Sequence, residues 1–267
     1  DGRIATLGED LDGNEIINAD KKLVMPGGIE AHCHIAQESA NGIMTSDDYE
    51  TGSISAAFGG NSCFVPFAAQ KKGESIASTI AEYDRRAETK SVIDYSYHLI
   101  LTDPNENVMN ELPSAFERGI TSFKVFMTYA TRVSDAQFLD ILTIARRHGG
   151  LTMVHAENHD MLSWMSNALT QAGYTEPRYH APARPSLAEE EAINRAISLS
   201  KLANAPLMIV HVSTPKGAEL VARARMDGAF VFGETCPQYL FLTRDDIDRP
   251  NLEGCLLYTS PSPRDRI

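Results

Sequence analysis

Two histidines, His32 and His34, are separated by a single residue, and their spacing is the strongest indication of chemistry in the sequence. They follow an apolar, strand-like run after Pro26. Side chains two positions apart on a strand point to the same side, so both imidazoles can bind one metal ion. Cys33, between them, should point to the opposite face and pack there. The pair alone leaves metal binding and chance placement on an exposed strand equally open.

Three further residues lie in the same kind of position. Lys124, His155 and His211 each stand at the end of a short apolar run rich in β-branched residues. A lysine there is usually a surface residue that extends its charge into water, so Lys124 alone indicates little. The repeated placement, however, turns a weak motif into a prediction of a metal centre.

Length, composition and charge limit the class of protein. The chain has 267 residues, of which 43% are hydrophobic, so it can bury a large core. Its net charge of −12 argues against nucleic-acid or anionic-membrane partners, which need a basic face. The four cysteines have no C-x-x-C spacing, which indicates reduced thiols and predicts a cytoplasmic protein. The first residue is not Met, and we expect an incomplete N-terminus.

Strand-like and helix-like segments alternate from residue 29 onward. Strands are predicted at 28–34, 61–67, 95–101, 120–127, 151–156, 207–212 and 229–234. Helices are predicted at 47–58, 74–87, 111–118, 135–148, 161–172, 186–203 and 216–226. Such alternation is typical of a parallel sheet covered by helices. Without a G-x-G-x-x-G or P-loop motif, a doubly wound nucleotide-binding sheet is the weaker alternative.

A (β/α)₈ barrel of the TIM type places its chemistry at the carboxyl ends of its strands, where all the candidate ligands fall. We therefore predict such a barrel over residues 29–254, lacking its eighth strand. Residues 1–28 read as short strands of a small β-sandwich domain that cannot bury its own core. The run Cys255–Asp265 resembles a translated sequencing adaptor, so 255–267 is interpreted as a non-native tail, with a natural Pro/Ser-rich tail as the alternative.

Several segments together resemble one known family. They are 24–34, 56–67, 122–129, 154–158, 179–192, 209–213 and 234–242. Over essentially all of residues 1–254 the chain is similar to the dihydropyrimidinase/hydantoinase family of the amidohydrolase superfamily. The segment Glu234–Leu240 is among the most family-specific.

The resemblance implies two divalent metal ions, usually zinc. By position, His32 and His34 would bind one ion and His155 and His211 the other, while a carbamylated Lys124 would bridge both. Tyr129 matches the family tyrosine that binds the substrate carbonyl and takes part in catalysis. The remaining family ligand, a strand-8 aspartate that is also the proton shuttle, has no counterpart in the sequence.

The activity implied is hydrolytic ring opening of a cyclic ureide, a 5,6-dihydropyrimidine or 5-substituted hydantoin, to an N-carbamoyl amino acid. An allantoinase, a dihydroorotase and a non-catalytic scaffold relative stay open as alternatives. The family resemblance also implies a homotetramer. Without strand 8 we expect this chain by itself to be inactive and poorly soluble. Glu189, Glu190 and Glu191 read as a solvated helix face.

Overall fold

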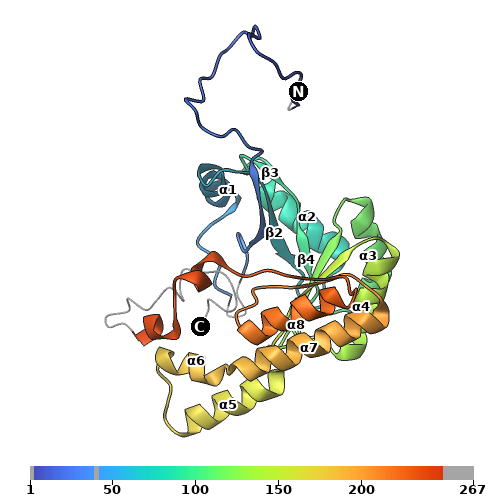
Figure 1. Ribbon diagram of the computed structural model, residues 1–267. Helices are drawn as coiled ribbons and strands as arrows, with labels where there is room; N and C mark the ends of the chain where they lie inside the picture. The colour runs from blue at the N-terminus through green and yellow to red at the C-terminus, as the bar shows by residue number, and fades with distance from the viewer. Residues whose placement is uncertain (1–2, 39–41, 249–267) are drawn as a thin grey trace.

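Parallel strands form one curved, open sheet in the computed structural model, which describes residues 3–38 and 42–248 (Figure 1). In spatial order the strands are β1 (Gly28–Cys33), β2 (Asn61–Ala69), β4 (His98–Ile100), β5 (Ser122–Phe126), β6 (Leu151–His155), β7 (Leu207–Ile209) and β8 (Val231–Gly233), and β3 (Asp94–Tyr95) pairs with β2. Every pairing is parallel. Spatial order follows chain order, as in a (β/α)₈ barrel, so the predicted fold class is confirmed as a partial barrel.

Helices follow most of the strands and cover the outer face of the sheet, while α5 lies against α6 and α7 (Figure 1). They are α1 (Tyr49–Phe58), α2 (Ile76–Ala87), α3 (Glu106–Glu117), α4 (Asp135–Arg147), α5 (His159–Gln171), α6 (His180–Ala183), α7 (Ser186–Ala203) and α8 (Pro215–Met226). Short 3₁₀ turns lie at η1 (Pro177–Tyr179), η2 (Pro237–Leu240) and η3 (Arg244–Asp248). The large core lies between the sheet and these helices. A smaller apolar cluster lies on the inner face of the sheet and consists of Phe67, Ile100, Phe126, Met153 and Val210.

Two predicted elements differ in detail. The strand predicted at 95–101 is divided into β3 and β4, because β2 pairs with each at a separate point along its length. Helix α3 begins at Glu106 instead of residue 111. Asn105 is its N-cap, and the side chain of Asn105 accepts a hydrogen bond from Val108 N. Pro113 is of a residue type that favours the first turn of a helix. Here it lies inside α3.

The N-terminal segment contradicts its predicted strands. Residues 3–27 contain no strand, and they run away from the sheet as an exposed trace (Figure 1). A strand needs a neighbour for its backbone N–H and C=O groups, and no described residue supplies one to this segment. The predicted tail 255–267 lies outside the described residues.

Helix α1 starts at a capping box that fixes the chain after β1. Asp48 accepts hydrogen bonds from Glu50 N and Thr51 N, both at 3.0 Å, while Thr51 Oγ1 accepts from Asp48 N. Lys90 donates to Asp48 Oδ2 at 2.8 Å. The hydrogen bond from Lys90, with that from Thr51 N, lowers the pKa of Asp48 to about 2.

Replacing Asp48 by alanine should destabilise the protein by about 1 kcal/mol, the usual cost of losing a cap. Since the folded-state pKa of Asp48 lies below its ordinary value of about 4, this contribution is present at neutral pH. It should fade as the pH falls from about 4 toward 2. Thermal unfolding of the two proteins at several pH values measures the difference. Asp48→Asn, which keeps the cap but loses the charge, should retain most of the stability; equal loss in both variants would contradict this account.

No helix within residues 3–38 and 42–248 combines the length and the apolar character needed to cross a bilayer.

Candidate metal centre and substrate cavity

The five predicted metal ligands gather at the carboxyl ends of four parallel strands. His32 lies near the end of β1, with His34 just after it, while Lys124 lies on β5 and His155 ends β6. His211 follows β7 by two residues. Ring centroids are 5.6 Å apart for His32 and His34, 5.8 Å for His32 and His211, and 4.6 Å for His155 and His211. The sheet therefore brings residues from distant parts of the chain into one cluster.

Lys124 is completely buried, with 0% of its surface exposed. Its Nζ is 4.9 Å from the centroid of the Phe67 ring and 5.6 Å from that of Phe126. The Phe67 ring stacks on His34 at 4.6 Å, and the Phe126 ring is 5.6 Å from the His155 ring. Nζ has no hydrogen-bond partner among the described residues. A lysine buried in this way does not behave as a surface residue.

Three of the histidines have one ring nitrogen bonded to an oxygen acceptor. Nδ1 of His32 contacts a carboxylate oxygen of Glu234, and Nδ1 of His34 lies 2.6 Å from Gln37 Oε1. Nε2 of His155 lies 2.6 Å from an oxygen of Glu157. Because an ionised carboxylate only accepts hydrogen bonds, the bonded nitrogen carries the proton and the other nitrogen keeps its lone pair.

The lone-pair nitrogen of an imidazole is the one that binds a metal ion, and partners of this kind orient it. These contacts assign Nε2 of His32 and Nδ1 of His155 as the lone-pair atoms. Nε2 of His32 is buried and has no hydrogen-bond partner within the described part of the chain. The arrangement therefore suits metal coordination.

Burial also keeps these groups in the neutral forms that coordination needs. Desolvation, with a smaller repulsion from Lys124, lowers the pKa of His32 to about 2. Desolvation lowers the pKa of Lys124, although attraction by Glu234 opposes the shift. The pKa of Glu234 is raised by its own burial and lowered in part by Lys124.

Within the described ranges, no three His, Cys, Asp or Glu side chains form a group that could hold a metal ion by themselves. The predicted donor set has a different form, two imidazoles for each ion and a shared oxygen ligand on Lys124. Nitrogen and oxygen donors of this kind are those of catalytic zinc sites. The residues present therefore fit a pair of metal ions on condition that Lys124 carries a bridging carboxylate.

Tyr129 and His211 both adopt backbone conformations that are uncommon outside glycine. Their φ angles are +71° and +42°. Such conformations cost about 1–3 kcal/mol each and cluster at functional sites. Tyr129 lies just after β5, with its ring 5.2 Å from that of His155. Both residues are thus held beside the ligand cluster by the surrounding fold.

Arg184 connects the histidine cluster to Tyr129. Its Nη1 donates to Glu157 Oε2 at 2.6 Å, and its guanidinium carbon lies 5.4 Å from the centroid of the Tyr129 ring. Burial disfavours the charged form of Arg184, yet attraction by Tyr129 and Glu157 outweighs it and raises the pKa of Arg184. Sequence reasoning gave neither Arg184 nor Glu157 a role. The one available signal was the i, i+2 spacing of His155 and Glu157.

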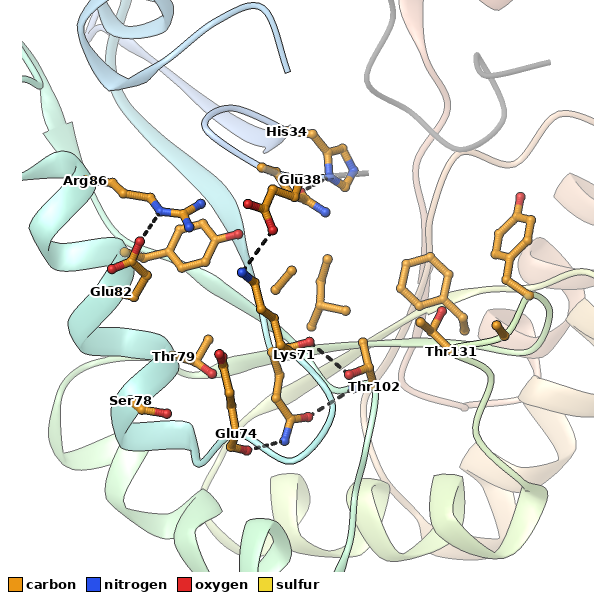
Figure 2. A pocket seen from close by; sticks show the side chains of 18 of the residues that line it. His34, Glu38, Lys71, Glu74, Ser78, Thr79, Glu82, Arg86, Thr102 and Thr131 are labelled. Atoms are coloured by element: carbon orange, nitrogen blue, oxygen red, sulfur yellow. Dashed lines mark hydrogen bonds and ion pairs between the residues drawn. The ribbon is translucent and has the colours of Figure 1, made fainter. Parts of the chain in front are cut away.

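A cavity of about 710 Å³ opens beside the cluster. Its lining includes His34, Ile100, Phe126, Tyr129 and Arg184. Figure 2 shows the cavity, where Lys71 pairs with Glu38 and Arg86 pairs with Glu82, at 2.9 and 2.8 Å. The volume is that of a small-molecule site.

The prediction that Glu189, Glu190 and Glu191 form a solvated helix face is wrong for Glu189. Glu189 is only 4% exposed. Its carboxylate accepts from the backbone N–H of both Ser213 and Thr214 at 3.0 Å, and from their hydroxyls at 2.8 and 2.9 Å. Glu189 thereby fixes the turn that follows His211 and leads into α8. A helical sequence pattern does not show that another loop packs on this face.

Comparison with known proteins finds the chain similar to D-hydantoinases and a dihydropyrimidinase. No protein-family model matches it. The D-hydantoinase of Geobacillus stearothermophilus is 42% identical over 271 aligned residues, covering 100% of this chain and 57% of the relative. The D-hydantoinase of Rhizobium radiobacter is 40% identical, with 99% and 58% covered. The chain thus spans somewhat more than half the length of these relatives.

Solved structures agree with the sequence relatives. The D-hydantoinase of Bacillus sp. AR9 superimposes with a TM-score of 0.89 at 43% identity, covering 92% of this chain and 55% of that one. The dihydropyrimidinase of Brevibacillus agri NCHU1002 gives a TM-score of 0.83 at 44% identity, covering 86% and 50%.

Proposed function

Because the chain belongs to the D-hydantoinase/dihydropyrimidinase family, we propose that it is part of an enzyme that opens cyclic ureides by hydrolysis. The substrates would be 5,6-dihydropyrimidines or 5-substituted hydantoins, and the products N-carbamoyl amino acids. The chain supplies the first part of the barrel. In the experiments below, full-length protein means this chain extended by the part of its relatives' length that it does not span.

One observation carries the proposal. Four histidines and a fully buried lysine meet at the carboxyl ends of β1, β5, β6 and β7, beside a cavity of about 710 Å³. Neither a structural core nor a simple binding cleft calls for a lysine buried among histidines, since burying its charge is costly. A metal centre that uses Lys124 as a ligand explains it.

In this proposal His32 and His34 would hold one divalent metal ion, His155 and His211 would hold a second, and a carbamylated Lys124 would serve as a ligand to both. When bound, two such ions supply Lewis acidity and make hydroxide available at neutral pH. The chain's own residues set the imidazole orientations. Glu234, Gln37 and Glu157 do so through the nitrogens that face away from the metal.

Lys124 must first become an oxygen ligand. Its neutral amine nitrogen attacks the carbon of CO₂ and releases a proton, which leaves an anionic carbamate. Burial lowers the pKa of Lys124 and thereby increases the fraction of neutral amine at a given pH. The same burial that makes an ammonium unfavourable thus favours the modified side chain.

Tyr129 is proposed to bind the substrate carbonyl. Its ring lies beside His155 at the cavity wall, and its hydroxyl can donate a hydrogen bond to the oxygen that becomes negative during attack. A donor of this kind is typically worth about 3–4 kcal/mol in the transition state. An acidic residue would transfer the proton from water to the leaving nitrogen. The family resemblance places this residue on the eighth strand of the complete barrel, which would follow residue 254 and is not the element labelled β8.

We also propose that residues 3–27 join a small β domain in the full-length protein. Leu23, Val24 and Met25 are 87%, 85% and 73% exposed, an unusual state for consecutive apolar side chains. Partner strands from elsewhere in the protein would cover them. Assembly of the protein into a homo-oligomer is part of the same proposal.

A substrate panel on the full-length protein tests the function. We expect ring opening of dihydrouracil or of a 5-substituted hydantoin, measured by loss of ring absorbance and appearance of the N-carbamoyl product. Hydrolysis of allantoin or dihydroorotate without either of these would assign the protein to a different cyclic amidohydrolase. Failure to open any of the four rings, with zinc present, would leave a non-catalytic scaffold and overturn the proposal.

A further inference from the structure

Four side chains form a closed circuit beside the predicted metal centre. Glu157 accepts from His155 on one side and from Arg184 on the other, each at 2.6 Å and at the same oxygen, Oε2. Arg184 lies 5.4 Å from the ring centroid of Tyr129, and that ring is 5.2 Å from His155. The contacts therefore form a ring in which His155, Glu157, Arg184 and Tyr129 each lie against the next, and Tyr129 lies against His155.

From this geometry we propose that Arg184 and Glu157 are positioning residues that hold the metal-binding imidazole of His155 and the substrate-binding ring of Tyr129 as one unit. The proposal rests on the proposed function, because it assigns His155 and Tyr129 the roles given above. It adds two residues that touch neither the metal nor the reacting atoms.

The side chains that form these contacts are largely shielded from water. His155 is fully buried and the side chain of Glu157 is 3% exposed, so water does not compete for the carboxylate. The side chain of Arg184 is 18% exposed and neutralises that carboxylate. Glu157 thus lies between the imidazole of His155 and the guanidinium of Arg184 and orients the Nε2 edge of the His155 ring. Nδ1 lies on the opposite edge of that ring.

The backbone around Arg184 is itself restrained. Arg184 lies between α6 and α7, its N–H donates to Ala181 O at 3.1 Å, and Pro185 follows it. Proline disfavours the helical conformation of the residue before it, and Arg184 lies outside the helical region, with φ −123° and ψ 70°. Glu157 comes from the other side of the cluster, two residues after His155 on the end of β6. The link therefore joins two separate segments across the site.

The experiment uses Glu157→Gln and Arg184→Lys in the full-length protein. Glu157→Gln keeps the shape of the side chain but removes its charge. Arg184→Lys keeps a positive charge but removes the planar guanidinium group. A matched control is Arg178→Lys, since Arg178 also pairs with a glutamate, Glu176, at 2.5 Å and lies 5.1 Å from a tyrosine ring, Tyr179. It belongs to η1, away from the ligand cluster.

The first measurement is zinc retention against a competing chelator, followed for each bound equivalent. Glu157→Gln should weaken one of two zinc equivalents about 10- to 100-fold, the usual effect of removing an orienting partner. Arg184→Lys should weaken the same equivalent and also lower kcat with little change in KM. Arg178→Lys should leave zinc retention and kcat at the level of the unsubstituted protein.

Wild-type retention of both equivalents in both variants would overturn this inference while leaving the proposed function intact. A raised KM in Arg184→Lys with unchanged zinc retention would overturn it too, because Arg184 would then contact substrate directly. If the unsubstituted protein binds no zinc and opens no ring, the proposed function itself fails. Thermal unfolding of the metal-free proteins separates a folding defect from lost positioning, since Glu157→Gln should unfold within a few degrees of the control.

Discussion

Replacing Lys124 by alanine in the full-length protein should release both metal ions and lower kcat/KM for ring opening by at least about 1,000-fold. The reason is that Lys124 is the one residue proposed to contact both ions, whereas loss of a mere orienting partner costs about 10- to 100-fold. Lys124 is completely buried, with Nζ close to the rings of Phe67 and Phe126. Metal analysis after gel filtration and the hydantoin assay measure the two effects.

Two controls separate this effect from general damage. Lys216→Ala removes an exposed lysine that pairs with Glu219 at 2.9 Å on α8, and it should change neither metal content nor turnover. Added acetate or propionate should partly restore Lys124→Ala, because a small carboxylate can occupy the space of the missing bridge. Full turnover in Lys124→Ala without added acid would contradict the proposed role.

The second large effect is expected at Glu189, and it concerns stability. Glu189→Ala removes the acceptor of four hydrogen bonds and leaves the buried N–H and hydroxyl groups of Thr214 without it. Each buried donor left unsatisfied costs about 1–3 kcal/mol, so we expect a loss of about 3–5 kcal/mol in the free energy of unfolding. Because the affected turn follows His211, retention of metal should fall as well.

Thermal unfolding of Glu189→Ala beside Glu190→Ala measures this loss. Glu190 is the adjacent, half-exposed residue, and its replacement should shift the midpoint very little. Glu189→Gln should lie between the two, because one acceptor oxygen remains. Equal midpoints for Glu189→Ala and Glu190→Ala would show that the four hydrogen bonds do not stabilise the protein.

Much of the fold follows from local patterns in the sequence. Near-continuous apolar runs such as Ser122–Phe126 and Leu151–His155 predict strands buried on both faces, and helical patterns between them predict parallel pairing. Since parallel strands present their carboxyl ends on one side, the positions of Lys124, His155 and His211 were enough to predict a cluster. The structure places these residues together, with His32 and His34.

The supporting residues could not be predicted in the same way. Glu189 is distant from His211 in the sequence, and only the packing of α7 against the turn after β7 makes it an internal acceptor. Arg184 lies in the short connection between α6 and α7, which has no periodic pattern. The prediction of strands in the exposed segment 3–27 was wrong for a related reason. Strand formation depends on partner strands that the local sequence does not reveal.

The most direct test of the metal centre is an anomalous-diffraction crystal structure of the full-length protein, grown with zinc and bicarbonate. We expect two metal peaks, one held by His32 and His34 and the other by His155 and His211. Continuous density should extend the Lys124 side chain by a carboxylate that contacts both. An unmodified Lys124 with no metal peak at the carboxyl ends of β1, β5, β6 and β7 would contradict the proposed metal centre.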